Sequence, residues 1–271
     1  MHFNFCRTGS DSQSIRNLLI TLLGTGTSQG IPVIGCKCAT CTSSDTRDKR
    51  LRCSILVQSD HASVVIDAGP DFRAQMLDAD VGELDAVLLT HEHNDHIIGL
   101  DDLRPLMFTS PNPIFIHAEK RVLAEVKTRF RYAFEKQPYP GAPEFQIAEL
   151  EVEKPLIIND LSFLPLRLIH GRLPVLGFRI GRFAYLTDTN LIPESTLDHL
   201  SDLEIIVIDA LRQKKHHSHY SLEESLEAIE MIGPKKAFLV HMSHRMGPTR
   251  EWEKELPDNV YPGYDGLQFE L

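Results

Sequence analysis

The feature that most constrains this chain is the heptapeptide THEHNDH at residues 90–96, which holds three histidines and two acids. An apolar run, DAVLL, precedes it, so the motif begins where a buried strand is expected to end. Residues i and i+2 of an extended segment point to the same side, so His91 and His93 should converge on one metal ion. Asp95 and His96 follow the strand and should serve a neighbouring ion. Neutral imidazole and carboxylate suit zinc, iron or manganese.

The same pattern recurs at the ends of other apolar segments. His170 follows LSFLPLRLI, Asp188 follows FAYLT, and His241 follows KKAFLV. Taken singly, each has an ordinary alternative, such as a polar residue at a strand end or, for Asp188, a helix N-cap. Strand ends are where sites are usually built, and four strands that end in His or Asp are difficult to attribute to chance. The sequence therefore predicts one shared metal site.

This ligand series resembles that of the metallo-β-lactamase superfamily, whose hallmark is H-x-H-x-D-H followed by His, Asp and His. The segments LLGTGTSQGIPVIGCKCATC and FLVHMSHRMG are similar to those of the PhnP-type phosphodiesterases. The resemblance extends from Leu18 to Leu271. It implies an α/β fold, a four-layer αβ/βα sandwich of two mixed sheets flanked by helices, with the site at one edge.

The resemblance also implies how the ligands divide between two divalent ions, zinc or manganese, with iron as a further candidate. One ion would bind His91, His93 and His170. The other would bind Asp95, His96 and His241, with Asp188 as the bridge between them and Asp95 also taking part in catalysis. Paired ions of this kind can hold a hydroxide at neutral pH for attack on phosphorus.

A second cluster, CKCATC, contains Cys36, Cys38 and Cys41. Its spacing fits a structural zinc site that lacks its fourth ligand, while reactive thiols and three unrelated buried cysteines are the alternatives. The resemblance supplies His244 as the fourth ligand, and Cys53 is the rival. Cys6, like Cys53 if it is not a ligand, is interpreted as structural or incidental.

The segment HHSHYSLEES holds three more histidines before a helix that a capping box opens at Ser221. The resemblance makes His219 a catalytic residue. Imidazole titrates near neutrality and could protonate the leaving alkoxide of a phosphodiester. His217 is a candidate for a supporting contact, and His216 is expected in a solvated loop.

Two other motifs are expected to have no chemistry of their own. GTGTSQG, residues 24–30, has glycine spacing that fails both the dinucleotide fingerprint and the P-loop, so it predicts a tight loop beside the metal site. TRDKRLR, residues 46–52, is basic and is expected to form a solvated connection, with contact to a phosphate as the alternative.

Composition limits the partners. The net charge of −10 argues against binding long nucleic acids, while metal ions or a local basic patch could still hold a small anionic phosphodiester. No apolar run approaches a membrane span, and the start lacks the apolar core of a signal peptide. With only five cysteines, a cytoplasmic location is expected. Residues 1–16 are expected to be a flexible leader and residues 17–271 one hydrolase domain, for which a homodimer stays open.

These features favour a dinuclear metal-dependent phosphodiesterase that hydrolyses a small, cyclic ribose or nucleotide phosphodiester by attack of a metal-bound hydroxide. A ribonuclease Z-like tRNA-processing endonuclease and a glyoxalase II-like thioesterase are alternative enzymes with related ligand sets. A metal- or ligand-binding module on the same fold is the non-enzymatic alternative.

Overall fold

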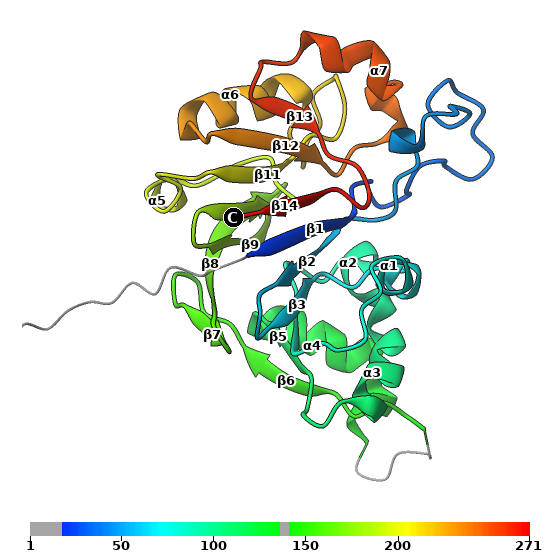
Figure 1. Cartoon of the computed structure of the whole chain (residues 1–271), viewed down its shortest axis with the longest axis vertical. Coiled ribbons are helices and arrows are strands. Elements are labelled where there is room, and N and C mark those ends of the chain that lie inside the picture. The colour runs from blue at the N-terminus through cyan, green and yellow to red at the C-terminus, as the bar shows by residue number, and fades with distance from the viewer. Residues whose placement is uncertain (1–17, 136–140) are drawn as a thin grey trace, which may run out of the picture.

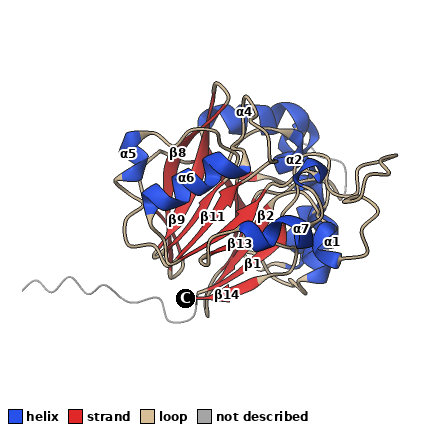
Figure 2. Cartoon of the chain, turned by 90° about the horizontal axis from the view of Figure 1, so that it is seen from above, coloured by secondary structure: helices blue, strands red, loops and turns tan. Residues whose placement is uncertain are grey.

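Two mixed β-sheets stack face to face and carry helices on their outer faces (Figures 1 and 2). The structure is a computed structural model that describes residues 18–135 and 141–271. This arrangement is the predicted four-layer sandwich. The predicted leader, residues 1–16, lies outside the described residues and stays a prediction. No helix in the described ranges has the length and apolar character that a bilayer span requires.

The first sheet comes mainly from the first half of the chain, and its strand order is β14-β1-β2-β3-β4-β5-β6. Its strands are β1 (Leu19–Gly24), β2 (Ser54–Gln58), β3 (Ser63–Ile66), β4 (Ala86–Leu88), β5 (Phe115–Ala118), β6 (Gln146–Glu149) and β14 (Gln268–Glu270). The helices of this half are α1 (Phe72–Asp78), α2 (Asn94–Ile97), α3 (Arg104–Thr109) and α4 (Lys120–Arg129). The predicted hairpin is present, because β2 and β3 pair antiparallel.

The second sheet has the order β13-β12-β11-β10-β9-β8-β7. Its strands are β7 (Leu156–Ile158), β8 (Leu161–His170), β9 (Leu173–Ile180), β10 (Phe183–Leu186), β11 (Ile205–Asp209), β12 (Lys236–Val240) and β13 (Val260–Pro262). The helices of this half are α5 (Glu194–Leu197), α6 (Leu222–Ile232) and α7 (Thr249–Trp252). The predicted capping box at Ser221 and Glu224 opens α6, and Gly233, at φ 69°, closes it.

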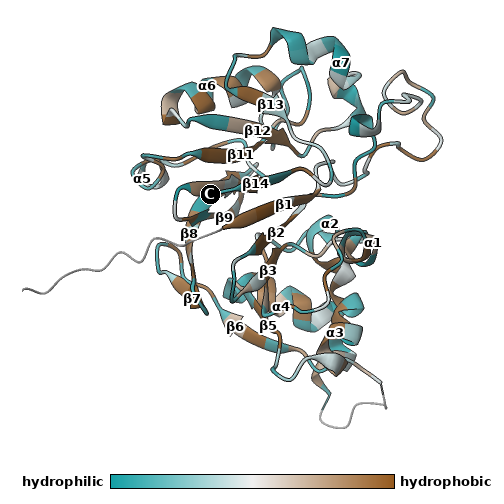
Figure 3. Ribbon diagram, in the orientation of Figure 1, coloured by the Kyte–Doolittle hydropathy of each residue, from teal (hydrophilic) through white to brown (hydrophobic). Residues whose placement is uncertain are grey.

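Apolar side chains fill the space between the sheets. The central strands are correspondingly coloured hydrophobic in Figure 3. Phe163, Phe178 and Phe183 are fully buried there against residues of the first sheet, such as Ile55. Separate apolar clusters join each sheet to its own helices. Burying both faces of the central strands in this way fixes their register, and therefore where each of them ends.

The directions of the strands bring the ends that carry candidate ligands to the same edge of the sandwich. In the first sheet β3, β4 and β5 are parallel, and in the second β10, β11 and β12 are parallel. β8 has the same direction as β10, because both are antiparallel to β9. The residues that follow these strands therefore gather at one side of the sandwich, as the sequence predicts.

The basic run at residues 46–52 is not a solvated connection throughout, so that prediction is wrong for Arg50. Only 3% of Arg50 is exposed. Its guanidinium donates hydrogen bonds to the hydroxyl of Thr25 at 2.7 Å and to the carbonyl oxygen of Gly263. The segment packs against the C-terminal part of the chain, and the local sequence does not indicate this long-range contact.

Candidate metal centre

His91, His93 and His170 form the first group of candidate ligands. Each offers a ring nitrogen, and these atoms lie within 4.8 Å of one another. His91 and His93 come from the loop after β4, while His170 is the last residue of β8, so the two sheets contribute to one group. These are the three residues predicted to share an ion.

Asp95, His96, Asp188 and His241 form the second group, again with ligand atoms within 4.8 Å of one another. Asp188 lies at its centre, with Oδ2 3.2 Å from His96 Nε2 and 3.1 Å from His241 Nε2. The same oxygen is 3.8 Å from Nε2 of His91 in the first group. The structure therefore joins all seven predicted ligand positions in one cluster, with Asp188 between the two groups.

Hydrogen bonds at Nδ1 orient three of these imidazoles. His96 Nδ1 lies 2.7 Å from Asp67, and His170 Nδ1 lies 2.7 Å from the carbonyl oxygen of Ser218. Thr90 donates its hydroxyl hydrogen to Asp67, so its oxygen accepts from His91 Nδ1 at 2.9 Å. When Nδ1 carries the hydrogen, Nε2 presents its lone pair, the state required of a metal ligand.

Asp67 is a site residue that the sequence analysis missed. It follows β3, is fully buried, and also accepts a hydrogen bond from the backbone N–H of Thr90 at 2.8 Å. Asp67 and His241 both have positive φ angles, 66° and 56°, which cost non-glycine residues of the order of 1–3 kcal/mol. The backbone therefore turns sharply at both positions to aim a side chain at the centre. The signal was present in the sequence, because VVIDAG places an aspartate after an apolar strand as AYLTD does.

His219 lies beside both ligand groups. Its ring centroid is 4.4 Å from that of His170 and 4.6 Å from that of His241. Its Nδ1 is 2.7 Å from Oδ2 of Asp209, the last residue of β11. Asp209 was also missed, although IIVIDA repeats the same strand-end pattern. Asp188, Asp209, His219 and His241 are close enough to surround an ion, but the direct hydrogen bond already occupies His219 Nδ1 and Asp209 Oδ2.

The charges differ between the two ligand groups. Burial and the neighbouring His96 hold the pKa of His91 well below its usual range, so this imidazole is neutral and ready to bind a metal. Burial also disfavours the charged form of His241, yet Asp188 outweighs it and raises the pKa of His241 to about 10. The same carboxylate raises the pKa of His96. The buried carboxylates of the second group therefore favour positive charge on the neighbouring imidazoles, and a bound cation would meet the same need.

The cluster fits divalent metal ions on its own geometry. Nε2 of His96 and Nε2 of His241 are buried and make no hydrogen bond, although each is close to Asp188. Buried polar atoms without a partner are uncommon, and here both point at the same carboxylate oxygen. A cation among these atoms would satisfy the two nitrogens and the carboxylate together.

A separate group joins Cys36, Cys38 and Cys41 to His244. Nδ1 of His244 lies 3.2, 3.4 and 3.6 Å from the three sulfur atoms. Cys53, the rival fourth member, is buried in the core between the sheets and does not belong to the group. A backbone N–H of Cys41 lowers the pKa of Cys38 to about 6, so this thiol readily supplies the thiolate that a metal binds.

The remaining polar residues of the two histidine-rich motifs belong to none of the candidate ligand groups. Glu92 forms an ion pair with Arg121, and Asn94 accepts a hydrogen bond from Arg129 at 2.8 Å, so both fasten the ligand loop to α4. His216 is half-buried with its ring centroid 5.4 Å from that of His219, whereas the neighbouring His217 is exposed. Burial, with the nearby His219, lowers the pKa of His216 to about 4.

Comparisons with known proteins agree with this geometry. The profile of a β-lactamase superfamily domain matches residues 62–242. A solved structure described as a new diphosphatase from the PhnP family is 37% identical, with a TM-score of 0.88 over 94% of this chain and 97% of that chain.

Two curated proteins are similar in sequence. An octanoyltransferase of Porphyromonas gingivalis (strain ATCC BAA-308 / W83) is 43% identical over 91% of this chain and 50% of its own length. A ribonuclease Z of Staphylococcus saprophyticus is 27% identical over 43% of this chain and 38% of its own length. The chain therefore spans half or less of the length of these relatives.

The role of Asp67 predicts that Asp67→Asn weakens metal binding by about tenfold to a hundredfold, the usual cost of losing a group that orients a metal ligand. Competition with a chelator of known affinity measures the change, and circular dichroism checks the fold. Asp85→Asn is the control, because Asp85 accepts a hydrogen bond from Ser63 N–H away from the centre. Equal affinities for Asp67→Asn and the wild type would contradict the role of Asp67.

The raised pKa of His241 predicts how metal-free protein responds to alkali. The folded-state pKa of about 10 lies above the ordinary 6.5, so proton binding to His241 stabilises the fold fully below about pH 6.5. This contribution is lost as the pH rises through 10. In chelator, the difference in free energy of unfolding between wild type and His241→Gln should therefore shrink from pH 7 to pH 10. The exposed His61, changed to Gln, is the control for the substitution itself.

Proposed function

The chain belongs to the metallo-β-lactamase superfamily, and from this premise we propose that it is a metal-dependent phosphodiesterase for a small anionic ester. A cyclic ribose phosphodiester or a short nucleotide ester is the favoured substrate class. The observation that carries the proposal is the His219–Asp209 pair, whose imidazole lies against both groups of candidate metal ligands. The similarity to a PhnP-family diphosphatase supports chemistry at phosphorus.

Two divalent ions would occupy the centre, one on His91, His93 and His170 and the other on Asp95, His96 and His241, with Asp188 shared. Zinc, manganese and iron all suit imidazole and carboxylate ligands. When bound, such a pair supplies Lewis acidity at the phosphoryl group and lowers the pKa of water.

His219 would donate a proton to the departing oxygen. Its Nδ1 hydrogen is held by Asp209, so Nε2 is the atom that would carry the transferred proton. Asp209 also accepts a hydrogen bond from the backbone N–H of Thr189 at 2.9 Å, which fixes the carboxylate and therefore the plane of the imidazole. A held imidazole loses little freedom when it transfers its proton, which favours general acid catalysis.

Asp95 would act on the nucleophile's side of the reaction. Its side chain is 14% exposed, against 2% for Asp188 and 0% for Asp209, so water has access to it. Burial works against its charge, but His96 and His241 hold the pKa of Asp95 far below its usual range. An ionised carboxylate that water can approach is suited to orient the attacking water.

The need for an acid separates the candidate substrates. A departing alkoxide is strongly basic and gains most from a proton donor. A thiolate leaves with a pKa near 8.5, and a phosphate with one near 6, so thioesters and diphosphates need the donor far less. The net charge of −10 disfavours tRNA. The held imidazole therefore favours a phosphodiester over a thioester or a diphosphate, and the net charge favours a small substrate over pre-tRNA.

We also propose that Cys36, Cys38, Cys41 and His244 bind a structural zinc. Zinc bonds of about 2.3 Å to sulfur and 2.0 Å to nitrogen, arranged as a tetrahedron, place sulfur and nitrogen roughly 3.5 Å apart. The three distances in the structure, 3.2–3.6 Å, agree with this spacing. Since His244 is three residues beyond His241, the zinc would tie the cysteine loop to the strand end that serves the catalytic centre.

A substrate panel on protein of defined metal content tests the proposed reaction. The panel comprises a cyclic ribose phosphodiester, a dinucleotide, a diphosphate, pre-tRNA, a glutathione thioester and an octanoyl thioester. The highest kcat/KM should fall on a small phosphodiester. A panel in which pre-tRNA or either thioester is turned over fastest would overturn the assignment, and inactivity on all six would favour a binding module.

His219→Ala should slow hydrolysis of an alkyl phosphodiester by about 100-fold or more, within the usual range of general acid catalysis. A p-nitrophenyl phosphodiester should be affected far less, because its leaving group needs no proton. Metal content, measured by elemental analysis, should stay at the wild-type value. The same loss for both esters would show that His219 does not act as the acid.

Cys38→Ser should lower the melting temperature by several degrees, because a structural zinc contributes directly to folding free energy. Chelation should produce a similar loss in the wild type and little further loss in the variant. Lys37→Ser is the matched control, since Lys37 is an exposed neighbour in the same loop. Unchanged melting of Cys38→Ser would remove the structural site.

A further inference from the structure

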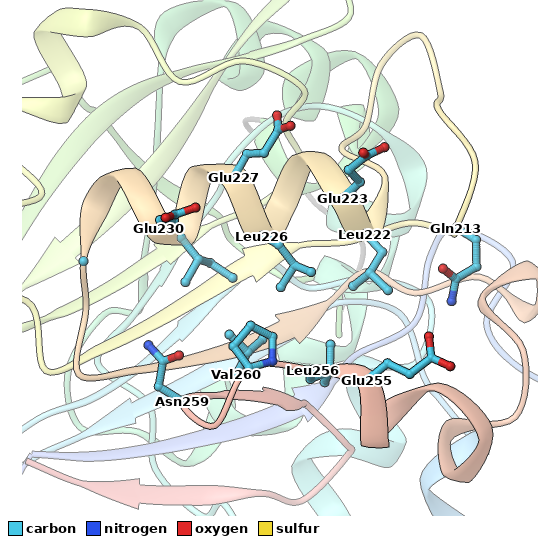
Figure 4. A pocket seen from close by; sticks show the side chains of 13 residues that line it. Gln213, Leu222, Glu223, Leu226, Glu227, Glu230, Glu255, Leu256, Asn259 and Val260 are labelled. Atoms are coloured by element: carbon cyan, nitrogen blue, oxygen red, sulfur yellow. The ribbon is translucent and has the colours of Figure 1, made fainter.

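A groove of about 860 Å³ lies along α6 (Figure 4). Its opposite wall is the segment from the 3₁₀ turn Glu253–Glu255 into β13. Figure 4 shows Leu222 and Leu226 of α6 pointing toward Leu256 and Val260 across the groove. The floor is therefore apolar, and none of these residues belongs to the candidate ligand groups.

Glutamates line the helix side of the groove, at the same spacing along α6 as the apolar residues of its floor. Glu223, Glu227 and Glu230 each follow an apolar lining residue, so the acidic and apolar positions both repeat at i, i+4 and i+7. This spacing makes two parallel stripes along one side of a helix. Glu255 adds a fourth carboxylate from the opposite wall.

These four carboxylates are exposed. Glu224 pairs with Lys215 and Glu253 pairs with Arg47, but among the described residues none of the four forms an ion pair. Glu223 in the first turn of α6 complements the helix dipole, but the like charge four residues later, at Glu227, is mildly destabilising. An apolar floor with an uncompensated acidic edge suits a ligand that is apolar on one face and basic beside it.

We propose that this groove binds a basic amphipathic helix of a partner protein. The 11 residues of α6 extend over about 16 Å, at 1.5 Å per residue, which matches about three turns of a second helix. Apolar side chains at i, i+4 and i+7 of the partner would contact the floor, the usual mode by which a groove binds a helix. Its Lys and Arg residues would face the glutamates. The same carboxylates repel nucleic acid and anionic lipid surfaces.

The experiment uses the full chain and a fluorescent 14-residue helical peptide of leucine and lysine with leucines at the i, i+4 spacing. The double substitution Glu227→Lys/Glu230→Lys should raise the Kd of the peptide, measured by fluorescence anisotropy, at least tenfold. Asp60→Lys/Glu83→Lys is the control, because it changes net charge equally in another surface hollow, lined by polar residues. The control should stay within about twofold of the wild type.

A charge-swapped peptide of leucine and glutamate gives a second readout. It should bind Glu227→Lys/Glu230→Lys and not the wild type, which shows that the variant is folded and that the contact is direct. An equal rise of the Kd in the control variant would show that only the net charge of the protein matters, and it would overturn the proposal. Equal binding of a peptide with serine in place of leucine would exclude the apolar floor. A wild-type dimer that the groove variant abolishes, seen by sedimentation, would assign the groove to a second copy.

Discussion

The hydrogen bonds that Asp67 and Asp209 accept determine what the metal centre can do. Asp67 holds Nδ1 of His96, and Asp209 holds Nδ1 of His219, each at 2.7 Å. The dependence is mutual, because burial raises the pKa of Asp67 and the imidazole of His96 opposes that shift. A fixed Nδ1 leaves Nε2 free for the role proposed for it, which is metal binding at His96 and proton transfer at His219. The chemistry of each imidazole is therefore set by its carboxylate partner.

The position of these carboxylates follows from the sandwich. Asp67 follows β3 in the first sheet and Asp209 ends β11 in the second, so these two carboxylates reach the shared edge from different sheets. The ligand loop packs closely on this edge, since a Cβ at Gly69 would lie 2.1 Å from the carbonyl oxygen of Asp95. Only glycine permits that approach, and it lets the backbone hold Asp95 and His96 at a fixed depth.

Much of the fold and of the cluster could be predicted because both depend on local patterns. Apolar runs that end in His or Asp identified the converging strands, and the i, i+2 spacing placed His91 and His93 in one group. The roles of Asp67 and Asp209 were not predicted, because an aspartate at a strand end is common. Only the tertiary fold shows that an imidazole lies next to each of them. Arg50 shows the same limit, because the carbonyl oxygen of Gly263 that it contacts is remote in sequence. The choice between His244 and Cys53 also required the packed structure.

The cysteine group also constrains the order of folding and metal binding. Cys36 and His244 are separated by 208 positions, so the group cannot form until the two ends of the domain have met. A metal held there would close most of the domain into one loop. The entropy of loop closure grows only with the logarithm of loop length, so such a link stays effective over this span. A metal bound by all four residues would therefore require that the segments around Cys36 and His244 have already come together.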